Sequence, residues 1–167
     1  MASFNITVNH VANAFIKKFK EENLDLTHMQ LQKLVYYAYA MFLFVDNKPL
    51  FKGKNSSEGD SPFEAWAYGP VSRELYNDIK SCNNNSYKVQ KELKTNEKLT
   101  KESEERLNSI VKNVCRIFQG WSAMKLSDLS HSIYGAWYKV KESDGKGDLF
   151  FLQNEDIRKE VKSLFVD

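Results

Sequence analysis

Twelve consecutive apolar residues, Leu34-Val35-Tyr36-Tyr37-Ala38-Tyr39-Ala40-Met41-Phe42-Leu43-Phe44-Val45, form the longest hydrophobic run of the chain. A membrane-spanning helix needs about 20 such residues, so the run predicts a helix buried in a protein core. Thr27 and Gln30 precede it at the spacing of a capping box, which places the helix over about residues 28–45. Apolar side chains occupy almost every side of this helix, and we therefore expect other helices to surround it.

Further helices are predicted on both sides of this run from apolar residues at helical spacing. They cover about residues 8–22, 71–80, 100–118, 123–131 and 155–165. Pro70 is expected in the first turn of the helix over 71–80, because proline suits that position. Residues 63–68 allow at most a small β element, and residues 135–147 are expected to be mostly loop. The prediction is a mainly α, single compact domain over residues 1–167, with five or six helices around the helix 28–45.

The composition is that of an ordinary soluble domain. The 167 residues are 42% hydrophobic, and 24 Lys and Arg face 22 Asp and Glu, for a formal charge of +2. This charge is too small to indicate nucleic acid or an anionic membrane as a partner. Two cysteines without CxxC spacing and no signal-peptide pattern favour a reducing, cytoplasmic location.

No sequence motif of catalysis or metal binding is present. The chain has no HExxH, GxxxxGK[ST], GxGxxG or GxSxG pattern, and its three histidines have no zinc-site spacing. A metal site would need a long-range set such as His28, His131 and Cys115. A small hydrolase would need Glu64 and His131 as an acid–base pair beside Trp66. We expect neither, and predict no enzyme activity, no metal and no cofactor.

Three segments carry a resemblance to a known family. They are Leu31-Gln32-Lys33-Leu34-Val35-Tyr36-Tyr37-Ala38, then Glu64-Ala65-Trp66-Ala67-Tyr68-Gly69-Pro70-Val71, then Leu126-Ser127-Asp128-Leu129-Ser130-His131, with Trp137 shortly after. In this order they resemble the Panacea domain family of SocA-like antitoxins, whose members are often labelled phage-associated proteins. The resemblance covers about residues 8–165. It departs mildly at Ser130, where the family usually has Thr, and at Gly135-Ala136-Trp137, where a Pro-Trp ending is more usual.

The resemblance implies a mostly helical domain that neutralises a toxin encoded beside it by binding the toxin. In the founding type the antitoxin also delivers its toxin to a bacterial protease. Some relatives carry an additional DNA-binding region before the domain, which the few residues preceding it here do not match, so direct DNA binding is not expected. The alternative partner is a host defence or nucleic-acid-processing complex that a phage-borne inhibitor would block. The sequence does not determine the oligomeric state.

The motif residues also have a physical interpretation. Gln32 and Lys33 interrupt the apolar helix and need solvent, a groove or a buried partner, for which Glu64 and Asp128 are the candidates. This polar cluster either fixes the packing or borders the surface that binds the partner. We place that surface at Trp66, Tyr68, Gly69, Pro70 and Arg73, extended by His131 and Trp137, because aromatic side chains beside an arginine are typical of interface hot spots. The alternative is that both tryptophans are core residues and only Tyr68 and Arg73 are accessible.

Overall fold

The computed structural model describes residues 5–54, 56–82, 87–143 and 151–166. Its first two helices, α1 (Val8–Glu21) and α2 (His28–Asp46), both begin at capping boxes. In α2 the Thr27 hydroxyl accepts the Gln30 backbone N–H, and the Gln30 side chain accepts the Thr27 N–H. Two otherwise unpaired backbone donors are satisfied in this way, which fixes the start of α2 where the sequence predicted it.

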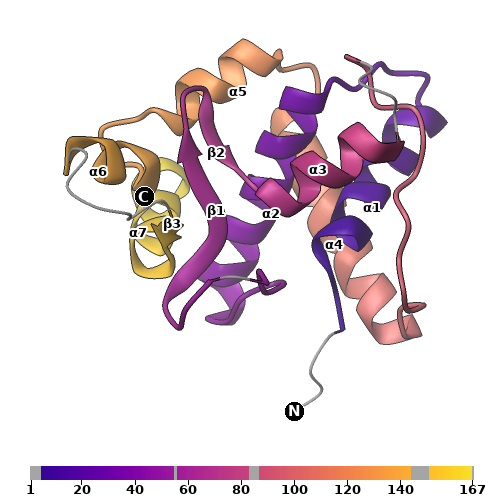
Figure 1. Cartoon of the computed structure of the whole chain (residues 1–167), viewed down its shortest axis with the longest axis horizontal. Helices are drawn as coiled ribbons and strands as arrows, with labels where there is room; N and C mark the ends of the chain where they lie inside the picture. Colours follow the sequence, from indigo (N-terminus) through magenta and orange to yellow (C-terminus); the bar gives the residue numbers. More distant parts are fainter. Residues whose placement is uncertain (1–4, 55, 83–86, 144–150, 167) are drawn as a thin grey trace.

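The apolar helix α2 packs against elements from every part of the chain (Figure 1). Its neighbours are α1, β2 (Gly69–Val71), α3 (Arg73–Cys82), α4 (Lys101–Phe118), α5 (Ala123–Ser130) and α7 (Asn154–Phe165). Buried side chains of α2 and of the five helices among these neighbours form one hydrophobic core. A helix that is apolar on nearly all sides requires such neighbours, because each exposed side would leave hydrocarbon in water. None of the described helices is both long and apolar enough to cross a bilayer.

The small β element that the sequence allowed near residues 63–68 is part of a three-stranded antiparallel sheet. β1 (Asp60–Trp66) lies between β2 and β3 (Phe151–Gln153), with Trp66 opposite Gly69 across the β1–β2 turn. The prediction for Pro70 was wrong: it lies in β2, and α3 begins only at Arg73. Pairing with β1 holds residues 69–71 extended, and this long-range contact overrides the local preference of proline for a first helical turn.

The described residues form seven helices, one more than the largest number predicted. The additional helix, α6 (Ala136–Glu142), lies in the segment 135–147 that was expected to be mostly loop; residues 144–147 are outside the described residues. Its N-cap residue, Gly135, has no side chain that could cap the helix, so the usual sequence signal for a helix start is missing. A carboxylate from α7 does this instead: Glu160 Oε1 accepts the Ala136 backbone N–H at 2.8 Å.

Candidate partner-binding site

Two polar side chains of α2 bind the backbone of β2 and of the residue that follows it. Gln32 accepts the Ser72 N–H at 2.9 Å and donates to the Ser72 carbonyl at 3.1 Å. The Lys33 Nζ atom donates to the Pro70 carbonyl at 2.9 Å, and the lysine is only 1% exposed. The polar interruption of the apolar helix therefore serves buried backbone groups, of which the Ser72 carbonyl also accepts the Tyr76 N–H at 2.9 Å.

The expectation that a carboxylate accompanies Lys33 was wrong. Among the described residues no carboxylate lies within ion-pair distance of its amine, and both Glu64 oxygens bind Arg73 instead, each at 2.9 Å. Asp128 is exposed on α5. Burial lowers the pKa of Lys33 from 10.5 to about 7, so a neutral amine is accessible near neutral pH. A neutral amine with a carbonyl acceptor avoids the need for a buried counter-charge.

Two further side chains hold the β1–β2 turn from the other side. The Ser127 hydroxyl of α5 donates to the Tyr68 carbonyl at 2.7 Å, and the Trp137 indole N–H of α6 donates to the Trp66 carbonyl at 2.6 Å. Together with the bonds from α2, the carbonyls at four alternate positions, 66, 68, 70 and 72, each accept a side-chain donor. These donors come from the first segment of the motif, from the third and from Trp137 after it, and they meet on the backbone of the second segment and of Ser72, the residue that follows it.

Gly69 allows the turn to approach this closely. Its φ is +112°, and a Cβ atom there would overlap Ser130 Oγ and lie 3.0 Å from Lys33 Cε. Only glycine combines this backbone conformation with the absence of a side chain. Both Gly69 and Pro70 are buried, so they shape the backbone of the turn and do not offer side-chain surface.

The large side chains that leave this turn toward solvent are those of Tyr68 and Arg73, and the small Ala67 is exposed beside them. Tyr68 is 59% exposed at the tip of the turn, and the Arg73 side chain is 61% exposed at the start of α3. The Arg73 guanidinium lies 5.2 Å from the ring centroid of Trp66. Trp66 and Trp137 are half-buried, so they are neither wholly core nor wholly surface.

His131 lies at the C-terminal end of α5, beside Trp137. Its ring stacks on Trp137 with 3.7 Å between ring centroids, and its Nε2 atom is buried without a hydrogen-bond partner among the described residues. Burial and the neighbouring charge of Lys33 lower the pKa of His131. Among the described residues no hydrogen bond joins His131 to Glu64, and both Glu64 oxygens bind Arg73.

The sequence reasoning missed an aromatic row that continues from Trp66. Tyr76 of α3 lies 5.0 Å from Trp66 and 5.1 Å from His28 between ring centroids, and Lys80 Nζ lies 5.2 Å from the Tyr76 ring. The sequence could have indicated this row, because the helical spacing of residues 73, 76 and 80 places them on one face of the predicted helix.

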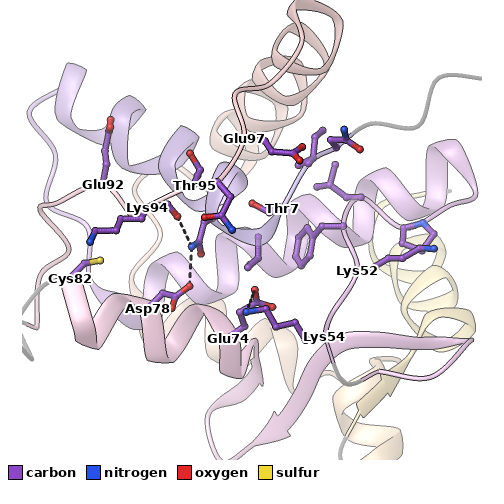
Figure 2. A pocket seen from close by; sticks show the side chains of 18 of the residues that line it. Thr7, Lys52, Lys54, Glu74, Asp78, Cys82, Glu92, Lys94, Thr95 and Glu97 are labelled. Carbon is purple, nitrogen blue, oxygen red and sulfur yellow. Dashed lines mark hydrogen bonds and ion pairs between the residues drawn. The ribbon is translucent and has the colours of Figure 1, made fainter.

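The opposite side of α3 borders a groove of about 1290 Å³ (Figure 2). The start of α1, the loop 48–54 and the extended segment 91–97 form its other walls. Glu74 and Asp78 point into it from α3. Lys54 pairs with Glu74 at 3.6 Å, and the Asn9 amide donates to Asp78 at 2.9 Å. Nothing in the sequence predicted this groove. Among the described residues no group of three His, Cys, Asp or Glu side chains is arranged to hold a metal ion.

Comparison with known proteins agrees with the placement of the motif. Residues 31–138 match the family described as "Antitoxin SocA-like, Panacea domain", and these residues contain every contact to the turn described above. The protein Antitoxin SocA of Caulobacter vibrioides (strain NA1000 / CB15N) is 24% identical over 147 residues, which cover 84% of this chain and 73% of that relative. No solved structure matches the chain. Because the family match spans well over half of its residues, the chain belongs to the SocA-like antitoxins of the Panacea domain family.

Proposed function

We propose that this protein neutralises a cognate protein toxin by binding it directly with the surface around the β1–β2 turn. The binding residues are Tyr68 and Arg73 with the exposed edge of Trp66, and His131 and Trp137 extend the surface. The family of the chain supports an antitoxin role. In this proposal the encounter takes place in the cytoplasm and needs no catalytic step.

One observation carries the location of the surface. Four side chains from three helices hold the backbone of residues 66–72, yet Tyr68 in this segment and Arg73 directly after it remain exposed. A rigid backbone loses little conformational entropy when its side chains engage a partner, which is an advantage in any binding protein. Tyrosine and arginine are also enriched among the residues that dominate interface energies.

The neighbouring reading frame provides the first test. Its product is expressed alone and together with this protein, and growth is measured. We expect a product that stops growth alone and is harmless in the co-expressing strain. If no such neighbour exists and the protein instead copurifies with a host defence complex, the antitoxin proposal is wrong and the inhibitor alternative replaces it. The level of the neighbouring protein in the co-expressing strain then tests a protease-adaptor role, which predicts that this level falls.

Substitutions test the surface itself. Tyr68→Ala and Arg73→Ala are each expected to weaken binding about 30-fold, which corresponds to about 2 kcal/mol. Arg73→Ala also leaves buried Glu64 without its cation, so Arg73→Lys is the control that keeps the charge and loses the two-point geometry. Charge reversal at exposed Lys112 on α4 is expected to change nothing. Full neutralisation by the Tyr68 and Arg73 variants, with loss in Lys112→Glu, would place the interface on α4.

A further inference from the structure

The helix α3 separates its charges onto two faces. Its carboxylates, Glu74 and Asp78, are four residues apart and both face the groove, where Lys54 and Asn9 engage them. The cations Arg73 and Lys80 lie on the other face, seven residues and therefore about 10 Å apart along the axis. The helix thus presents a basic face to solvent while its own acidic side chains are turned away.

An aromatic layer lies along this basic face. The ring of Tyr76 lies between those of Trp66 and His28, with about 5 Å between the ring centroids on each side. Arg73 lies against Trp66, and Lys80 lies against Tyr76. Burial lowers the pKa of His28 to about 4, so its ring is a neutral aromatic group at neutral pH. Exposed Asn77 adds a hydrogen-bonding amide between the two cations.

The net charge of this face is one positive charge, from Lys80, because Arg73 is paired with Glu64. Glu64 occupies the Nε and Nη2 atoms of Arg73, which leaves Nη1 without a partner in the described structure. No described carboxylate lies within ion-pair distance of Lys80. Both cations therefore retain N–H donors for an external anion, and a carboxylate of a partner could accept a hydrogen bond from each of them.

We propose that this basic face of α3, formed by Arg73, Tyr76, Asn77 and Lys80 and backed by Trp66 and His28, receives an acidic segment of the partner protein. The inference rests on the proposed function and specifies the chemistry of the toxin: two carboxylates about 10 Å apart, flanking an apolar or aromatic side chain that packs on Tyr76. A nucleic acid fits less well, because two cations beside a groove with acidic residues give too small a field for a polyanion.

The test measures the association kinetics of the neighbouring gene product with wild-type protein and with Lys80→Glu. At about 50 mM NaCl we expect the association rate constant of Lys80→Glu to be about tenfold lower, because a charge at the rim of an interface acts mainly on the encounter. At about 500 mM NaCl the difference is expected to shrink to about twofold, since exposed charges are then screened. Lys112→Glu, which changes the net charge equally, is the matched control and is expected to show a much smaller effect at both salt concentrations.

Three results would overturn the inference. The first is Lys80→Glu binding like wild type while Tyr68→Ala binds weakly, which would leave the proposed function intact and remove only the acidic segment. The second is tight binding of a thymidine oligonucleotide of about 20 nucleotides that Lys80→Glu abolishes, which would assign the face to single-stranded nucleic acid. The third is failure of the neighbouring protein to bind or to be toxic at all, which would remove both proposals together.

Discussion

Lys33 is a buried amine with one hydrogen-bond acceptor, the Pro70 carbonyl, and no ion-pair partner among the described residues. Its burial lowers the pKa from 10.5 to about 7, so the folded state binds fewer protons than the unfolded state between these two pH values. The free energy of unfolding contributed by this residue therefore rises with pH across that window, and below about pH 7 the full penalty for burying the charge remains.

Lys33→Met removes this dependence and retains the apolar stem. Between about pH 7 and pH 9 we expect the free energy of unfolding of the wild type to rise by roughly 2 kcal/mol more than that of the variant. The reason is that the folded and unfolded wild type differ by nearly one bound proton over this range, and such a difference is worth about 1.4 kcal/mol for each unit of pH. Urea unfolding of both proteins at the two pH values measures this difference. An equal effect of the substitution at both pH values would show that Lys33 does not titrate in this range.

The same lysine marks the limit of sequence reasoning at the residue scale. A charged residue within an apolar helix indicates that a partner must exist, and this inference from Lys33 and Gln32 was sound. The expected partner was a carboxylate, whereas the observed acceptors are the carbonyls of Pro70 and Ser72. Backbone carbonyls are present at every residue, so the sequence carries no signal that singles out these two.

At the scale of elements, the β1–β2 hairpin depends on a close approach at Gly69. Gly69→Ala would introduce a Cβ into Ser130 Oγ and the Lys33 side chain, in addition to the strain of a positive φ. Gly120 is a matched control, because it also has a positive φ (+86°) but nothing within 4 Å of the added Cβ. We expect Gly120→Ala to destabilise by about 1 kcal/mol through backbone strain alone, and Gly69→Ala by at least about 2 kcal/mol more.

Urea unfolding of both glycine variants checks this prediction, and binding to the neighbouring gene product adds a functional readout. Gly69→Ala is expected to weaken binding because displacement of β2 moves Tyr68 and Arg73 together. Equal destabilisation by the two substitutions would mean that the neighbours of Gly69 yield freely, and that the hairpin is not held by the contacts assigned to it.

Elements with a local signal were predictable, and elements built by distant contacts were not. α2 and α4 carry both a capping residue and an apolar stripe, and the sequence predicted each of them. By contrast, α6 has seven residues and follows a glycine N-cap, and its first backbone N–H is bound by Glu160, which lies 24 residues further along the chain. The strand β3 has three residues, too few for a readable alternation, and is defined by pairing with β1.

At the scale of the whole molecule, buried titratable groups on different elements act on one unfolding equilibrium. The helices and the strands β1 and β3 contribute buried side chains to one hydrophobic core, so we expect the chain to unfold in a single step, and each shifted pKa then contributes to the global free energy of unfolding. His28, with a pKa lowered to about 4, makes stability rise between about pH 4 and 6.5, because the folded state binds fewer protons there.

Glu160 acts in the opposite direction. Its burial, at 1% exposure, raises the pKa from 4.5 to about 7, so the folded state binds more protons than the unfolded state between these values. The stability contributed by Glu160 is present below about pH 4.5 and is lost as the pH rises to 7. The slopes from His28 and Glu160 overlap between about pH 4.5 and 6.5 and oppose each other.

Glu160→Gln separates the two effects. The amide oxygen can still accept the Ala136 N–H and the Tyr36 hydroxyl, both of which bind Oε1, while the side chain can no longer ionise. As the pH rises from about 5 to about 8, we expect the free energy of unfolding of the wild type to fall by roughly 2 kcal/mol relative to that of the variant. Only the wild type must bury a charged carboxylate at the higher pH. Urea unfolding at both pH values measures this difference, with the exposed Glu105→Gln on α4 as the control expected to show none. A Glu160→Gln effect that is the same at both pH values would mean that Glu160 is already charged in the folded protein at pH 5, and that its unpartnered Oε2 atom is solvated.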